Sequence, residues 1–286
     1  MADARISNQG TEKSSKNCAS YLKIKNDPQL EIHSKESVSS FLALCETIKK
    51  EEVKSGNKAD FLFRGQSTDE PLIPKIARLR SKGELQNIES LMMDEFERQS
   101  LPFTEFEPTN KWDLLAMAQH HGLPTRLLDW SRSALAGLWF SVKNPPKKNA
   151  EGLELDGVVW LLKTMADDFI EFPPDESPYS PTKTRIFRPR SVSRRILAQA
   201  GFFTCHKRMR TGKFIALEKN KAYKERLVKI VIPANSFHRI RDQLDACGVN
   251  SVSLFPDLDG LAAHLRFRYF HDAKVKGKLR FPFKFI

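Results

Sequence analysis

The pattern of hydrophobic and polar positions predicts a series of amphipathic helices. From Val38 to Ile48 the apolar residues recur every three or four positions, and Ser37 stands where an N-cap is expected. Gly122 suits the left-handed turn that ends a helix. The predicted helices cover residues 38–48, 84–99, 112–121, 192–200 and 237–247, the segment from a cap at Ser131 or Ser133 to Phe140, and the segment from 258 onward.

Short apolar runs between these helices predict buried strands. They cover residues 61–63, 125–128, 158–162, 202–203, 214–217, 227–232 and 252–255, while the proline-containing stretches 143–157 and 173–189 are expected to be loops. Because strands and helices mix without strict alternation, we predict an α+β fold with a mixed sheet and surrounding helices. Residues 1–20 are polar and aperiodic, which predicts a flexible tail before one domain over residues 21–286.

Composition narrows the class of protein. The chain is 40% hydrophobic and has 20 phenylalanines, enough for a large core. Its longest apolar stretch, from Ala134 to Val142, is about half of the roughly 20 residues that a membrane span requires. The N-terminus lacks the apolar core of a secretory signal, so we expect a cytoplasmic protein that does not enter a membrane. The four cysteines are too scattered to predict a metal site or disulfide framework.

The positive charge is concentrated in one segment. The net charge is +12, and between Glu176 and Glu218 there are ten lysines and arginines but no acidic residue. Such a field attracts polyanions, and RNA is the expected one, although an acidic partner protein or a plain solvated face would also fit. The residues expected to contact nucleic acid are Arg188, Arg190, Arg194, Arg195, Lys207, Arg208 and Arg210.

Candidate chemistry begins at Arg64, which follows a predicted buried strand. A guanidinium in that position is costly unless it binds an anion or backbone carbonyls. Gly65 would let a ligand or another backbone approach closely. An ion pair with a core carboxylate such as Asp129 is the competing structural explanation.

A second cluster gathers unlike polar groups around one predicted helix-to-strand turn. Residues 119–130 read Gln-His-His-Gly-Leu-Pro-Thr-Arg-Leu-Leu-Asp-Trp. His120 could act as an acid, a base or a donor near neutral pH, or be a buried structural residue. Asp129 could orient Arg64 or Arg126, or form a plain salt bridge.

The third cluster is residues 254–260, Leu-Phe-Pro-Asp-Leu-Asp-Gly. Asp257 could cap the helix that follows it. Its carboxylate could equally stabilise a positive charge that develops during a reaction.

These three blocks together resemble the FRG domain family. Phe63-Arg64-Gly65 is the motif that names the family, and the other two blocks resemble its central and C-terminal signatures. The resemblance runs from about residue 61 to residue 270. The family is described by its motifs more than by an activity.

A weaker resemblance is to ADP-ribosyltransferases of the Arg-Ser-Glu type. Those enzymes place an aromatic-Arg-Gly motif on an early strand to hold NAD, and they use an acidic residue to steady the oxocarbenium-like ribose. The resemblance implies an ADP-ribosyltransferase-like core with NAD as cofactor and no metal. It implies catalytic roles for Arg64, His120 and Asp257, and cofactor binding by Arg64, Gly65, Gln119, Thr125, Arg126 and Asp129.

The leading hypothesis is therefore an NAD-dependent ADP-ribosyltransferase that acts on nucleic acid, with RNA expected. By analogy it would be a toxin or phage-defence effector that an antitoxin protein holds in check. Two alternatives stay open. One is a non-catalytic module that binds nucleic acid or a protein partner, and the other is a metal-free nuclease that uses His120.

Overall fold

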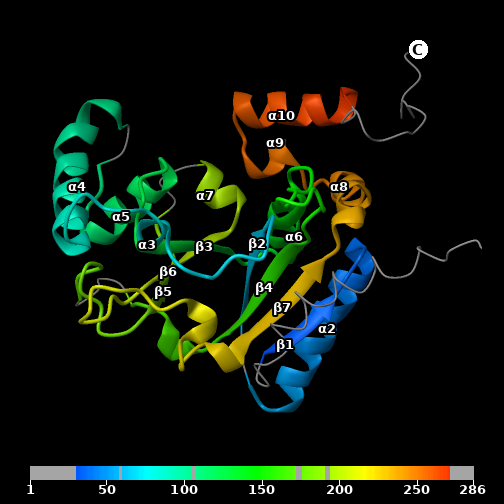
Figure 1. Cartoon of the computed structure of the whole chain (residues 1–286), viewed down its shortest axis with the longest axis horizontal. Coiled ribbons are helices and arrows are strands. Elements are labelled where there is room, and N and C mark those ends of the chain that lie inside the picture. The colour runs from blue at the N-terminus through cyan, green and yellow to red at the C-terminus, as the bar shows by residue number, and fades with distance from the viewer. Residues whose placement is uncertain (1–29, 58–59, 105–106, 172–175, 191–193, 271–286) are drawn as a thin grey trace, which may run out of the picture.

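A seven-stranded sheet organises the fold (Figure 1). The computed structural model describes residues 30–57, 60–104, 107–171, 176–190 and 194–270, so the predicted tail lies outside the described residues. The strands follow the order β1-β7-β4-β2-β3-β6-β5. Their bounds are β1 Glu31–Ser34, β2 Asp60–Gln66, β3 Leu127–Ser131, β4 Gly157–Thr164, β5 Arg185–Phe187, β6 Gly201–Cys205 and β7 Leu227–Ile232.

The sheet is mixed, as predicted, and it is weakly joined in the middle. β1 and β7 are parallel, and all other neighbouring strands are antiparallel. β2 pairs with β4 along its whole length, and β3 does the same with β6. Between β2 and β3, however, the only paired residues are Phe63 and Ser131. The two halves of the sheet therefore diverge on one side of this pair.

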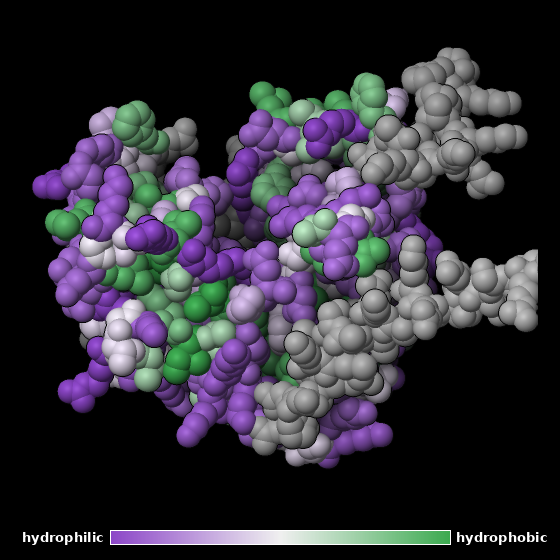
Figure 2. Space-filling view, viewed as in Figure 1, coloured by the Kyte–Doolittle hydropathy of each residue, from purple (hydrophilic) through white to green (hydrophobic). Residues whose placement is uncertain are grey.

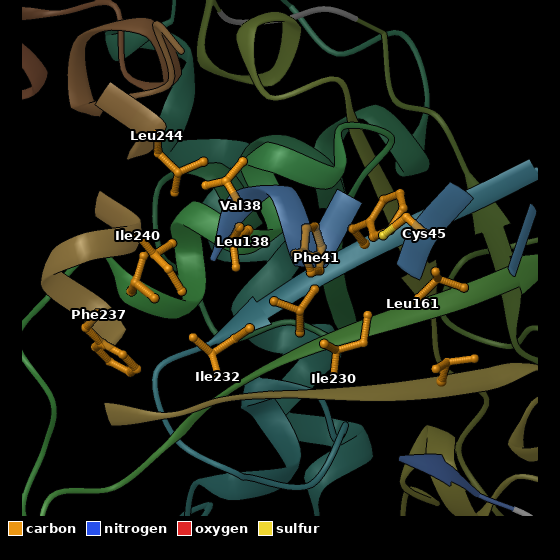
Figure 3. Packing of buried hydrophobic residues seen from close by; sticks show 14 of the residues in the cluster. Val38, Phe41, Cys45, Leu138, Leu161, Ile230, Ile232, Phe237, Ile240 and Leu244 are labelled. Carbon is orange, nitrogen blue, oxygen red and sulfur yellow. The ribbon is translucent and has the colours of Figure 1, made fainter. Parts of the chain in front are cut away.

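Helices cover the sheet on one face and extend beyond it. Apolar residues of α2, α6 and α8 pack on β2, β4 and β7 in one cluster (Figure 3), while α4 and α5 pack on β3, β5 and β6 in another. The α-helices are α2 Val38–Lys54, α3 Lys75–Arg78, α4 Leu85–Ser100, α5 Lys111–His120, α6 Ala134–Val142, α7 Arg194–Ala198, α8 Phe237–Ala246, α9 Ser251–Leu254 and α10 Leu258–Tyr269. Short 3-10 helices lie at Leu101–Phe103, Ala166–Asp168, Leu217–Lys219, Lys224–Arg226 and Ala234–Ser236.

Several local predictions are confirmed by the caps. The Ser37 side chain accepts a hydrogen bond from the Ser40 amide at the start of α2, and Ser133 caps α6 through the Ala136 amide. Gly122 has a φ of +87° directly after α5. None of the helices in the described part of the chain combines the length and apolar character that a membrane crossing requires.

Two strand predictions are wrong. Residues 252–255 lie mostly in helix α9, because Asn250 accepts hydrogen bonds from the Val252 and Ser253 amides and so starts a helix. Residues 214–217 form no strand, and the segment turns into a 3-10 helix at Leu217. The sequence pattern also missed β1, β5 and α3.

Gly65 lies inside β2, because the strand runs to Gln66 rather than ending at Phe63. A Cβ atom on Gly65 would lie 2.6 Å from the Ser141 amide nitrogen and closer still to the Gly137 carbonyl oxygen. On α6, a Cβ on Gly137 would lie 2.7 Å from the Phe63 Cβ. The two glycines therefore let the helix sit directly on the strand, so the close approach predicted at Gly65 is made by backbone.

We expect Gly65→Ala to destabilise the protein by about 2–3 kcal/mol, because the added methyl group collides with helix backbone that cannot move away cheaply. Urea unfolding measures the change. Gly83→Ala is the control, since its Cβ would meet only the Ile88 side chain, at 3.7 Å or more. Equal stability of Gly65→Ala and the wild type would show that β2 and α6 can separate without loss.

Candidate functional site

Arg64 spans the gap where β2 and β3 diverge. Its Nη1 donates a hydrogen bond to the Asp129 carbonyl oxygen at 2.7 Å and lies 3.5 Å from the Asp129 carboxylate. The side chain is 14% exposed, and its Nε is buried without a hydrogen-bond partner in the protein. Desolvation lowers the pKa of Arg64, and the Asp129 charge opposes that shift. The structural explanation is therefore confirmed, because Arg64 pairs with Asp129, and one buried donor of the guanidinium has no partner in the protein.

Three further residues of the central signature form a hydrogen-bonded chain that ends at Asp129. The Gln119 amide nitrogen donates to Asp129 Oδ1 at 3.0 Å, and the Thr125 hydroxyl donates to Gln119 Oε1 at 2.6 Å. The Leu127 amide donates to the Thr125 hydroxyl, which connects this series of hydrogen bonds to the start of β3. The structure therefore brings Arg64, Gln119, Thr125 and Asp129 together.

Arg64, Gln119 and Asp129 line a cavity of about 310 Å³, whereas Thr125 is fully buried behind it. The lining also includes two cations that the sequence analysis missed. Lys75 and Arg78 line the cavity from α3. Lys75 Nζ donates to the Gly122 carbonyl oxygen at 2.9 Å, and Arg78 pairs with Glu70 at 3.0 Å. A local feature that could have predicted α3 is Pro74, because its fixed φ suits the start of a helix. That helix carries a lysine and an arginine one turn apart.

His120 is the last residue of α5 and is partly buried. Burial, followed by the charges of His121 and Arg195, lowers its pKa, while Asp129 and Asp257 act in the opposite direction. The ring is therefore neutral at pH 7. His121 is exposed. No three His, Cys, Asp or Glu side chains in the described segments are grouped so that they could hold a metal ion.

The Asp257 carboxylate is already engaged. Its Oδ1 accepts the Gly260 amide at 2.8 Å as the N-cap of α10, and its Oδ2 accepts from Arg195 Nε at 2.6 Å. These contacts lower the pKa of Asp257.

Figure 2 shows that the surface is hollowed between the side of the molecule that carries α4 and α5 and the side that carries α9 and α10.

Arg126 is separated from this group, although it lies in the same signature. It is 1% exposed, and its Nε and Nη2 donate to the two carboxylate oxygens of Glu89 on α4. Arg126 is absent from the lining of the Arg64 cavity and borders a different one. Gly65 likewise packs on α6.

The basic segment is partly neutralised by acids from elsewhere in the chain, which the sequence analysis did not anticipate. The ion pairs are Lys183–Asp167, Arg185–Glu176, Arg190–Asp113 and Arg195–Asp257. Arg188, Lys207 and Arg210 are exposed, and the Arg194 side chain lies outside the described residues. The positive field is therefore weaker than a count of the segment's charges predicts.

His206, the residue directly after β6, is buried and lies close to Thr204. His206 is 1% exposed, and its Nε2 lies 3.1 Å from the Thr204 hydroxyl, which accepts the Trp130 indole N–H. Burial, followed by the charge of Arg64, lowers the pKa of His206 to about 3.

The fold and the site define an α+β protein with a cationic cavity between two diverging strands. Residues 59–150 match the family model described as the FRG domain. The chain therefore contains an FRG domain, and the matched region holds the Arg64 motif and the central signature. The block at residues 254–260 lies outside it. No curated protein and no solved structure shows significant similarity to the chain.

We expect Glu89→Gln to cost about 3–5 kcal/mol of unfolding free energy, because it leaves the buried Arg126 charge without its partner. The double variant Glu89→Leu, Arg126→Met should recover most of that loss, since two apolar side chains need no pairing. Urea unfolding reports both values. Glu95→Gln, which breaks an exposed pair with Arg98, should change stability by less than about 1 kcal/mol. Similar small losses for Glu89→Gln and Glu95→Gln would contradict this assignment.

The lowered pKa of His206 predicts a pH-dependent stability. Between pH 6.5 and about 3 the unfolded chain binds a proton at His206 that the folded chain does not, so this residue's contribution is complete above pH 6.5 and is lost as pH falls. The loss approaches about 1.4 kcal/mol per pH unit. His206→Gln should flatten the acid limb of a stability-against-pH curve. An unchanged slope in His206→Gln would refute the prediction.

Proposed function

We propose that the chain is an NAD-dependent ADP-ribosyltransferase that acts on a nucleic acid, with RNA as the expected acceptor. The observation that carries the proposal is the buried Arg64 guanidinium, whose Nε has no partner in the protein and whose side chain lines a cavity. A buried charged donor without a partner is costly, and an anionic ligand would complete it.

The residues of the cavity fit the chemical groups of NAD. Arg64, Lys75 and Arg78 supply three cations for a pyrophosphate, and Gln119 and Asp129 supply an amide and a carboxylate for ribose hydroxyls. A volume of about 310 Å³ is enough for the pyrophosphate and a neighbouring ribose of NAD. The remainder of NAD would extend out of the cavity into the surface hollow. When bound, NAD would supply the ribose–nicotinamide bond that breaks as ADP-ribose passes to the acceptor.

We assign the catalytic roles from the same geometry. Asp129 is the carboxylate at the cavity, and its side chain is 59% exposed, so we assign it the task of stabilising positive charge on the ribose. Asp257 would instead hold Arg195 beside His120. His120, which is neutral at pH 7, can accept a proton from the acceptor group.

The charge of the chain supports a nucleic-acid acceptor. The net charge is +12, and Arg188, Lys207 and Arg210 remain exposed after the ion pairs within the basic segment are counted. We extend the proposal to a toxin or phage-defence role with a neutralising antitoxin, because modification of RNA would stop growth unless a partner blocked it. A cytoplasmic location belongs to the same proposal.

Arg64→Lys should leave the fold intact but weaken NAD binding at least about tenfold, because an ammonium cannot reproduce the guanidinium fork. For the wild type, NAD at about 100 times its dissociation constant should add roughly 2.7 kcal/mol of stability. Thermal unfolding with and without NAD measures this effect, and mass spectrometry of RNA and protein after incubation with NAD measures transfer. Arg132→Lys is the control, since Arg132 forms an exposed pair with Asp60.

The two readouts separate the possible functions. NAD stabilisation without transfer to RNA or protein would favour the non-catalytic binding module. Absence of any NAD effect on the wild type would refute the proposal, and RNA cleavage that depends on His120 would then favour the nuclease.

A further inference from the structure

A second cavity collects buried donors that have no partner. Six buried side-chain nitrogen or oxygen atoms in the described residues lack a hydrogen-bond partner in the protein. Three of the six belong to residues that line this one cavity, namely Arg126 Nη1, Tyr179 Oη and Arg208 Nη1. Because buried polar groups are nearly always paired, three unpaired groups around one space indicate a missing ligand.

The cavity is distinct from the Arg64 site. It has a volume of about 700 Å³ and shares no lining residue with the Arg64 cavity. Its walls are the start of α4, the loop at Tyr179–Pro181 and the turn from Arg208 to Lys213. Arg208 and Phe214 form a β-bridge at the base of that turn, and Gly212 has the positive φ of +78° that lets the turn close.

The Arg126 side chain is held in one orientation by its neighbours. Two of its nitrogens are fixed by Glu89, and its guanidinium carbon lies 5.9 Å from the centre of the Tyr179 ring and 5.8 Å from that of Phe214. The third nitrogen, Nη1, is therefore presented without rotational freedom. A donor that is already ordered loses little entropy when it binds a ligand.

The local charge favours an anion. Glu89 balances Arg126, and the lining then has Arg208, Arg210 and Lys213 against the single carboxylate of Glu84. Burial lowers the pKa of Arg208, and the neighbouring charge of Arg126 lowers it further. Burial, together with the charge of Glu89, raises the pKa of Tyr179, so its hydroxyl stays protonated and can donate.

We propose that this cavity binds the phosphate group of a ligand of nucleotide size. Arg126 and Arg208 supply guanidinium N–H groups and Tyr179 supplies a hydroxyl, so three donors from separate segments can reach different phosphate oxygens. A volume of about 700 Å³ lies within the range of small-ligand pockets and leaves room for a nucleoside beside the phosphate. The inference stands apart from the proposed transfer reaction, because it requires neither NAD nor Arg64.

Tyr179→Phe is the sharpest test, because it removes only a hydroxyl that makes no hydrogen bond in the protein. The variant should be as stable as the wild type or slightly more stable, yet bind adenosine 5′-monophosphate and inorganic phosphate about tenfold more weakly. Tyr223→Phe is the matched control, since its hydroxyl donates to the Thr184 carbonyl at 2.9 Å. That variant should lose stability and keep its affinity. Calorimetric titration measures binding, and urea unfolding measures stability.

Arg208→Gln should also bind both phosphates at least about tenfold more weakly. Adenosine, which has no phosphate, should not bind measurably. A short single-stranded RNA with a 5′-phosphate should bind better than the same RNA without it if the natural ligand is an RNA end, and equally if it is a free nucleotide. The proposal is overturned if the wild type binds neither small phosphate, or if Tyr179→Phe and Arg208→Gln bind them as tightly as the wild type does.

Discussion

The structure depends on how Arg64 is accommodated between two strands that pair at a single position. β2 and β3 pair only at Phe63 and Ser131, so few backbone hydrogen bonds join the two halves of the sheet. The Arg64 guanidinium adds a further link through the Asp129 carbonyl oxygen. A charged group in this place is tolerated because the carbonyl, the Asp129 carboxylate and the open cavity together replace part of its hydration. The gap in the sheet and the candidate site are therefore one feature.

The signature residues of the FRG domain divide into two physical classes around this feature. Gln119 and Asp129 line the cavity, and the buried Thr125 holds Gln119 in place by a hydrogen bond. Gly65 and Arg126 support the fold, the first by allowing α6 to contact β2 and the second by anchoring α4 through Glu89. A motif residue can thus support the fold around a cavity without lining that cavity. For Arg126, the group left over from its structural role faces a second cavity.

The two cavities are built in a similar way. Each contains an arginine that is held by one carboxylate-bearing residue and keeps one nitrogen unpaired and buried. Holding an arginine in this way fixes its direction before a ligand arrives, which favours binding of anions with a defined geometry. The positive charge of the chain therefore lies in these two cavities as well as on the exposed surface.

The sequence by itself determined the mixed α+β class, most helices, the cap at Ser37 and the grouping of Gln119, Thr125 and Asp129. These follow from spacing along a few residues, where local hydrogen bonds and hydrophobic periodicity decide the structure. Only the tertiary structure decided that Glu89 pairs with Arg126 and that acids from distant segments neutralise Arg190 and Arg195. It also decided that Lys75 and Arg78 line the same cavity as Arg64. Such pairings depend on distances between segments far apart in the chain, and one sequence carries no local signal of those distances.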